Sequence, residues 1–277
     1  MTEPSVARLV AHHIRYQNRL FWRAPIGAFF TIALPLIMLV LFDAIFDGDV
    51  EIGGRGPVSI TQFYTPALAA FAAASATYTN LGTGLAIYRE DGVLKRFRST
   101  PLPPWVYIAG AIGSGVWIAA IANAIMIGIA VVGFDVSLPA DRIPAAAVAF
   151  GFGVFAFAAL GVALASLAPS GGAAPAMANA TILPLSFISN VFIPLEDPPA
   201  WLDTVGDIFP LKHFVEAFLA PFDPTSTGSG FEWGDLAVVA VWGVLGAVVA
   251  VRSFRWQPTV GKARSGRRSR TGARSAR

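Results

Sequence analysis

The sequence of 277 residues contains no cysteine and has few charged residues. The absence of cysteine excludes disulfides, thiolate zinc sites, iron–sulfur clusters and cysteine nucleophiles. Only 13% of the residues are charged, whereas an ordinary soluble domain has roughly 25%. Hydrophobic residues make up 55%, the mean hydropathy is +0.61, and the apolar residues form long blocks. The composition therefore argues against a soluble enzyme and favours a membrane protein.

The stretches without Asp, Glu, Lys or Arg predict the membrane spans, because a spanning helix needs about 20 mostly apolar residues. The stretch from 143 to 195 is long enough for two crossings, and Pro169, Gly171 and Gly172 separate them. The pattern predicts an all-α polytopic membrane protein in which residues 24–255 form the spanning domain. Six helices are expected, at about 25–46, 63–87, 105–132, 144–167, 173–195 and 234–252.

The net charge of +3 conceals a separation of basic and acidic residues into different segments of the chain. Of the 20 Lys and Arg residues, 17 precede the first span, lie between spans two and three, or follow residue 251. Of the 17 acidic residues, 14 are predicted to face the opposite side. The Lys/Arg bias places both termini and the loop between spans two and three in the cytoplasm.

The two ends of the chain differ from the apolar blocks. Residues 1–23 have the pattern of a basic amphipathic helix in the membrane interface, an elbow helix that would link the spans to a cytoplasmic partner. Its basic residues recur at spacings of three or four: Arg8, His12, Arg15, Arg19 and Arg23. The alternative is a basic flank that only sets topology. Residues 256–277 form a basic tail predicted to be disordered and to touch anionic lipid, with a nucleic-acid role disfavoured.

The loop after the second predicted span has six charges within ten residues, from Arg89 to Arg98. Val93, Leu94 and Phe97 would share one side of a short helix, which the residue before Pro101 would end. Such a helix suits a docking element. From spacing alone, a solvated connector with topogenic charge is an equal alternative.

The sequence gives little support for an enzyme or for an ion-coupled transporter. The only histidines are His12, His13 and His213, and the first two are predicted to lie across the membrane from the third, so no metal site is expected. No span core clearly contains a charged residue, which argues against a proton-driven transporter. Six polar residues are candidates for lining a pathway or for bonds between helices: Thr77, Tyr78, Asn80, Asn123, Asn179 and Thr181. The small residues in 151–168 are expected to allow close helix packing.

Two motifs resemble the type-2 ABC permease family, the transmembrane subunits of ABC exporters, and its daunorubicin-exporter-like branch in particular. The loop after span two matches the family at Arg89, Glu90, Gly92, Leu94, Arg96, Thr100, Pro101 and Leu102. The end of span five matches it at Phe187, Ser189, Phe192, Pro194, Pro199, Trp201, Leu202 and Pro210. The sequence departs from the family at Asn190, where Gly is usual, at Ile193 and at Phe209. The likeness covers roughly residues 5–255.

The resemblance implies a permease subunit that works as a homodimer or close heterodimer with two copies of a cytoplasmic ABC ATPase in the bacterial inner membrane. The sequence has no G-x-x-x-x-G-K-[ST] loop, so ATP and Mg²⁺ are expected on the partner and no cofactor on this chain. A hydrophobic or amphipathic cargo, drug or lipid-like, fits the uncharged spans. The alternatives are a secondary transporter or channel without an ATPase, and a polysaccharide or lipid-linked glycan exporter.

The resemblance also assigns candidate roles to residues. Those expected to couple to the ATPase are Arg89, Glu90, Asp91, Gly92, Leu94, Arg96, Thr100 and Pro101. Those expected to form an outer gate, together with short re-entrant or interfacial helices before the last span, are Phe187, Phe192, Pro194, Trp201 and Pro210.

Overall fold

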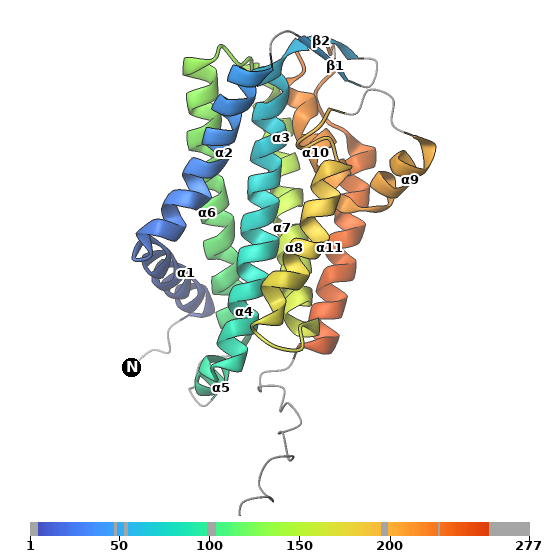
Figure 1. Ribbon diagram of the computed structural model, residues 1–277. Coiled ribbons are helices and arrows are strands. Elements are labelled where there is room, and N and C mark those ends of the chain that lie inside the picture. The colour runs from blue at the N-terminus through green and yellow to red at the C-terminus, as the bar shows by residue number, and fades with distance from the viewer. Residues whose placement is uncertain are drawn as a thin grey trace, which may run out of the picture.

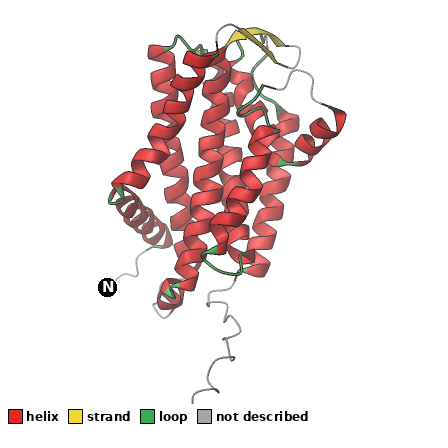
Figure 2. Cartoon of the chain, viewed as in Figure 1, coloured by secondary structure: helices red, strands yellow, loops and turns green. Residues whose placement is uncertain are grey.

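The computed structural model describes residues 5–46, 49–52, 55–98, 104–194, 199–226 and 228–254. They form a bundle of mostly helical elements (Figures 1 and 2). The elements of the first half are α1 (Val6–Trp22), α2 (Pro25–Ile45), β1 (Asp49–Ile52), β2 (Arg55–Ser59), α3 (Ile60–Ser75), the π-helix η1 (Ala76–Asn80), α4 (Leu81–Glu90), α5 (Val93–Arg98) and α6 (Pro104–Gly133). Those of the second half are the 3₁₀ turn η2 (Ala140–Arg142), α7 (Ile143–Leu167), α8 (Ala173–Phe187), α9 (Ala200–Ile208), α10 (Pro210–Leu219), the 3₁₀ turn η3 (Ala220–Phe222) and α11 (Trp233–Ser253).

Four helices in the described part of the chain are long and apolar enough to cross a membrane: Ala28–Ile45, Trp105–Gly133, Ala140–Leu167 and Trp233–Ser253. They coincide with four of the six predicted spans. The predicted span at 63–87 falls on three consecutive segments, α3, η1 and α4, because a π-turn divides the helix.

The predicted span at 173–195 corresponds to α8, which has only 15 residues and ends at Phe187. The chain then turns, and Asn190 adopts a left-handed backbone with φ 55°. Asn tolerates this region far better than most residues with a side chain. Asn190 therefore suits the position at which the resembling family has Gly.

The expectation of an all-α chain needs one correction, because β1 and β2 form an antiparallel two-stranded sheet. Val50 pairs with Val58, and Gly53-Gly54 separates the strands in the sequence. Two short strand-like runs joined by a Gly-Gly pair are a recognised hairpin signal. The sequence interpretation missed it because the acidic residues of this loop were considered only as topology signals.

Helix α7 lies at the centre of the bundle and packs against α11, α4, α10 and α3. In the most apolar stretch of 18 residues in this helix, 56% is buried inside the bundle, compared with 11% in the corresponding stretch of α2. Small residues allow the close approach: a Cβ at Gly243 of α11 would lie 3.1 Å from Ala156, and one at Gly153 would collide with the Phe214 ring of α10. The expected packing role of the small residues in 151–168 is thus confirmed at Gly153 and Ala156.

The two ends of the bundle differ in their elements. The α5 end carries α1, α5 and the turn between α7 and α8, and the hairpin end carries β1, β2 and the short helices α9 and α10 (Figure 1). At the hairpin end, the buried Gln62 accepts a hydrogen bond from the Ser137 amide and donates to the carbonyls of Ser137 and Phe222. Gln62 therefore joins α3 to the loop after α6 and to η3.

Candidate functional site

Helix α1 has one packed face and one basic face. The predicted residues Arg8, His12, Arg15, Arg19 and Arg23 are all exposed. The opposite face packs mainly on α6, and its one buried side chain is His13. The helix therefore presents a row of positive charge away from the bundle.

His13 is 6% exposed and lies 4.8 Å, centroid to centroid, from the Tyr107 ring of α6. Burial lowers the pKa of His13, and the neighbouring His12 lowers it further, so the neutral imidazole is favoured at the contact. The contact requires two glycines: a Cβ at Gly110 would collide with the His13 ring, and one at Gly113 would lie 2.6 Å from the Ile14 side chain. The sequence analysis missed this contact between α1 and α6, although the Gly-x-x-Gly spacing places both glycines on one face of α6.

Arg89, predicted to couple to the ATPase, is 3% exposed and points into the bundle. Its Nη1 donates to the Ala165 carbonyl at 2.7 Å and its Nη2 to the Ala168 carbonyl at 2.5 Å. These carbonyls belong to the last turn of α7 and its C-cap, where a helix has unpaired acceptors and partial negative charge. Arg89 therefore caps α7 from α4.

Glu90 acts on the other side of the same turn. Its Oε2 accepts a hydrogen bond from the Gly171 amide, two residues before α8 begins. Partial positive charge at a helix N-terminus favours a carboxylate there. We call Arg89, Glu90 and the turn 168–172 that they hold the α4 clamp.

Helix α5 follows the clamp directly. Gly92 makes the break between α4 and α5 with φ 72°, a conformation that Gly adopts without strain. Leu94 is fully buried, whereas Asp91, Lys95 and Arg96 are exposed. The described coupling residues with long side chains therefore divide into the buried Arg89 and Leu94 and an exposed charged set, to which Glu90 also belongs although it bonds to the Gly171 amide. Thr100 and Pro101 lie outside the described residues.

The predicted outer-gate residues come together only in part. The Phe192 ring lies 5.3 Å from that of Phe187 and 5.0 Å from that of Phe71, and Tyr64 donates to the Phe192 carbonyl. Pro210 is buried at the first position of α10, where its missing amide proton costs nothing. Pro194 is partly buried. Trp201 of α9 stands apart and is 67% exposed.

Three of the six polar residues considered for a pathway form hydrogen bonds within the bundle. The hydroxyl groups of Tyr78 and Thr181 lie 2.7 Å apart, and Thr77 donates to the Ala73 carbonyl. Asn123 differs, because its amide is buried without a hydrogen-bond partner among the described residues.

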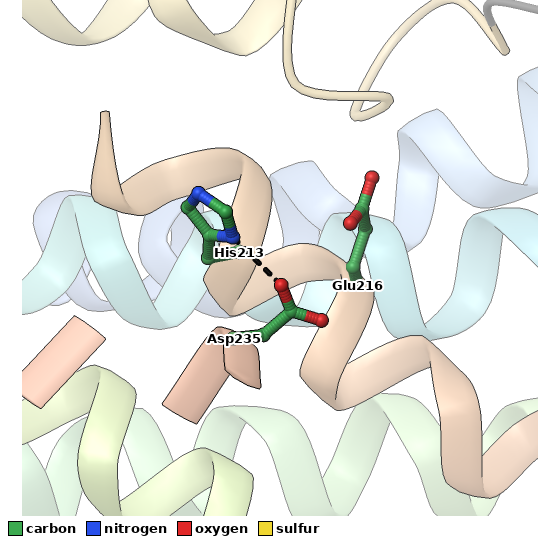
Figure 3. Close-up of side chains that lie close together, drawn as sticks. All are labelled: His213, Glu216 and Asp235. Atoms are coloured by element: carbon green, nitrogen blue, oxygen red, sulfur yellow. Dashed lines mark hydrogen bonds and ion pairs between the residues drawn. The ribbon is translucent and has the colours of Figure 1, made fainter. Parts of the chain in front are cut away.

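A second cluster, at the hairpin end, joins α10 to α11. His213 Nδ1 lies 2.7 Å from Asp235 Oδ1, and its Nε2 lies 2.8 Å from the Asp207 carbonyl. Glu216 lies beside them (Figure 3). The hydrogen bond to Asp235 raises the pKa of His213 against the opposing effect of burial.

Ligand atoms of His213, Glu216 and Asp235 lie within 4.8 Å of one another, the one grouping in the described residues that could hold a metal ion. The hydrogen bond between His213 and Asp235 accounts for their approach without an ion. The sequence analysis missed the pair because its members are 22 residues apart.

The arrangement of long apolar helices defines the class of the protein, a multi-pass helical membrane protein. Comparison with known families gives a more specific result: residues 9–222 match the ABC-2 type transporter model, and the chain belongs to that family. The chain is also 29% identical over 210 residues to the daunorubicin resistance ABC transporter permease protein DrrB1 of Streptomyces coeruleorubidus, a match that covers 71% of each chain. The resemblance drawn from the two motifs is thus confirmed, and the chain is a transport permease.

Proposed function

We propose that this chain is the membrane subunit of an ATP-driven exporter. Two permease copies, as a homodimer or close heterodimer, would work in a bacterial inner membrane with two copies of a cytoplasmic ABC ATPase that binds ATP and Mg²⁺. The cargo would be hydrophobic or amphipathic. The family supports an ATPase partner in general, and the name of the relative, a daunorubicin resistance permease, supports drug-like cargo.

The proposed topology has six crossings and both termini in the cytoplasm. The segment from α3 through α4 would cross once despite its π-turn, and α8 would cross with the turn that follows it. Helix α1 would be the elbow helix. The Lys/Arg bias supports a cytoplasmic α5 end.

The observation that carries the proposal is the placement of charge at the α5 end. The exposed Asp91, Lys95 and Arg96 and the basic face of α1 lie at the same end of the bundle (Figure 1). This surface is held in place, because Leu94 is buried and the α4 clamp joins α4 to α7 and α8. Motion of an ATPase bound to α5 would therefore reach the centre of the bundle.

The structure changes how we divide the predicted coupling residues. We assign direct ATPase contact to Asp91, Lys95 and Arg96, and transmission of the motion to Arg89 and Glu90. The original expectation that Glu90 contacts the ATPase stays a prediction. Because Glu90 already holds the Gly171 amide, Glu90→Lys should impair coupling more than binding.

The test is co-purification of the permease with an ABC ATPase of the same organism, together with ATPase turnover in lipid nanodiscs. The Lys95→Glu/Arg96→Glu variant should reduce co-purification about tenfold or more, as expected for a loss of at least 1.4 kcal/mol in binding. The matched control is Asp141→Lys, which changes an exposed charge at the hairpin end. Gradient-driven flux through the chain alone, with no ATPase required, would overturn the proposal.

A further inference from the structure

A pocket of about 380 Å³ lies between α1, α2, the η1–α4 segment and α6. Its size falls in the range of pockets that bind drug-sized molecules. The α1 wall includes Gln17, Leu20 and Phe21, and the α6 wall includes Tyr107 and Ser114. The pocket therefore lies where the basic amphipathic helix meets the long apolar helices.

The chemistry of the lining is apolar with a few uncharged polar groups. Its polar side chains include Gln17, Thr31, Asn80 and Ser114, and none of the lining residues is charged. An ionic group in such a pocket would lose hydration without gaining a partner of opposite charge. The lining therefore suits the uncharged body of a molecule that has a few hydrogen-bonding groups.

Two glycines and part of the π-helix contribute to the wall of the pocket. Gly84 of α4 and Gly115 of α6 both line it, and a Cβ at either position would meet nothing within 4 Å. Ala76 and Asn80, the first and last residues of the π-helix η1, also line it. π-turns are rare and often occur at functional sites, because the extra residue turns the following helix face.

The π-helix also joins the pocket to the core. A Cβ at Gly161 of α7 would lie 2.6 Å from the Thr77 carbonyl oxygen of η1, so the two backbones are in direct contact. A ligand that displaced Ala76 or Asn80 would push on α7 through this contact. The α4 clamp holds the end of the same helix.

We propose that this pocket binds the body of an uncharged amphipathic molecule, with α1 as one of its walls. The assignment rests on the proposed export function, which would make the pocket a loading site for cargo. It names the chemical class of the cargo and the part of the chain that receives it.

The test uses the full-length chain in lipid nanodiscs and a monoacylglycerol with a diazirine in its acyl chain, an uncharged amphipathic photoprobe. Labelling mapped by mass spectrometry should concentrate on pocket residues such as Phe21, Tyr107 and Ala111. Gly115→Leu places a side chain in the open space and should reduce this labelling about fivefold or more, equivalent to roughly 1 kcal/mol in binding. Gly84→Leu should act in the same way from α4.

The matched control is Gly128→Leu, also on α6, where a Cβ again meets nothing within 4 Å and the residue is exposed away from the pocket. Labelling there should equal that of the unmodified chain, and thermal unfolding should show that all three variants are folded. Labelling spread over the lipid-facing surface, or unchanged by both pocket variants, would overturn the proposal. The assay needs no ATPase, so failure of the pocket and failure of the exporter are separate results.

Discussion

The α5 end and the hairpin end of the bundle are both held by charged side chains, but the environments of these charges differ. At the α5 end, Arg89 is buried and bonds to backbone carbonyls. At the hairpin end, Lys212 pairs with Asp203 and Asp207, whose side chains are 50% and 54% exposed. Buried charges bonded to backbone are costly to disturb, whereas exposed ion pairs contribute little and are screened by salt. The hairpin end also holds a buried charge of the first kind, because Arg142 donates to the carbonyls of Asp223 and Ser226. The buried arginines should therefore stabilise the bundle more than the Lys212 ion pairs do.

The largest expected effect is that of Arg89→Ala. It would leave the carbonyls of Ala165 and Ala168 without their cap, at a cost of about 3 kcal/mol. Thermal unfolding in detergent should show this loss. Arg15→Ala, on the exposed face of α1, is the control and should leave the unfolding temperature nearly unchanged. Equal unfolding temperatures for the two variants would show that the α4 clamp does not stabilise the bundle.

Gly110→Val should rank next, because its side chain would collide with the His13 ring and lift α1 from α6. Overpacking of this kind costs about 1–3 kcal/mol. Protease cleavage within α1 should become faster. Gly128→Val, where an added Cβ meets nothing within 4 Å, should cleave at the rate of the unmodified chain. If the Gly110→Val chain resists the protease as well as the control does, α1 is not packed on Gly110 as the structure shows.

At the hairpin end, the His213–Asp235 bond should make stability depend on pH. The folded pKa of His213 is raised above 6.5, so protonation favours the folded chain, and the groups facing the imidazole are Asp207, Glu216 and Asp235. This contribution is fully present below pH 6.5 and is lost as pH rises through the folded pKa. The stability difference from His213→Gln should shrink over that window. A stability difference that grows with pH would show that protonation of His213 does not favour the folded chain.

The smallest effect is expected for Lys212→Met, which removes two partly exposed ion pairs. Such pairs contribute about 0.5 kcal/mol, and the difference should disappear at high salt. Urea unfolding at low and high salt measures it. A loss as large as that of Arg89→Ala would show that these ion pairs stabilise the bundle as much as a buried arginine does.

Much of the architecture could be predicted from the sequence because membrane helices follow one-dimensional rules. Length and lack of charge located α2, α6, α7 and α11. The helical period of Arg8 to Arg23 predicted the basic face of α1, since spacings of three and four share a face. The structure departs from this rule at two places: the loop before α3 contains a hairpin, and helix α8 ends at Phe187, short of the predicted bound at residue 195. The fifth span stays a prediction.

The roles of individual residues were harder to predict from the sequence. The buried Arg89 and the Gly171-bonded Glu90 were grouped with Asp91, Lys95 and Arg96 because consecutive charges in a loop look alike in sequence. Their partners lie about 80 residues away, in the α7–α8 turn that carries no charge of its own. The buried His13 differs from the exposed His12 only by a rotation about the helix axis.

The sequence by itself determined the membrane class, the apolar blocks of the predicted spans and, through two motifs, the family, because hydropathy, charge bias and motif spacing are local properties of the chain. Tertiary structure alone decided which charges are buried, where α1 packs on the glycines of α6, and that α1, α2, η1, α4 and α6 line an uncharged pocket. These features depend on contacts between residues far apart in the chain, and only the packed bundle brings them together.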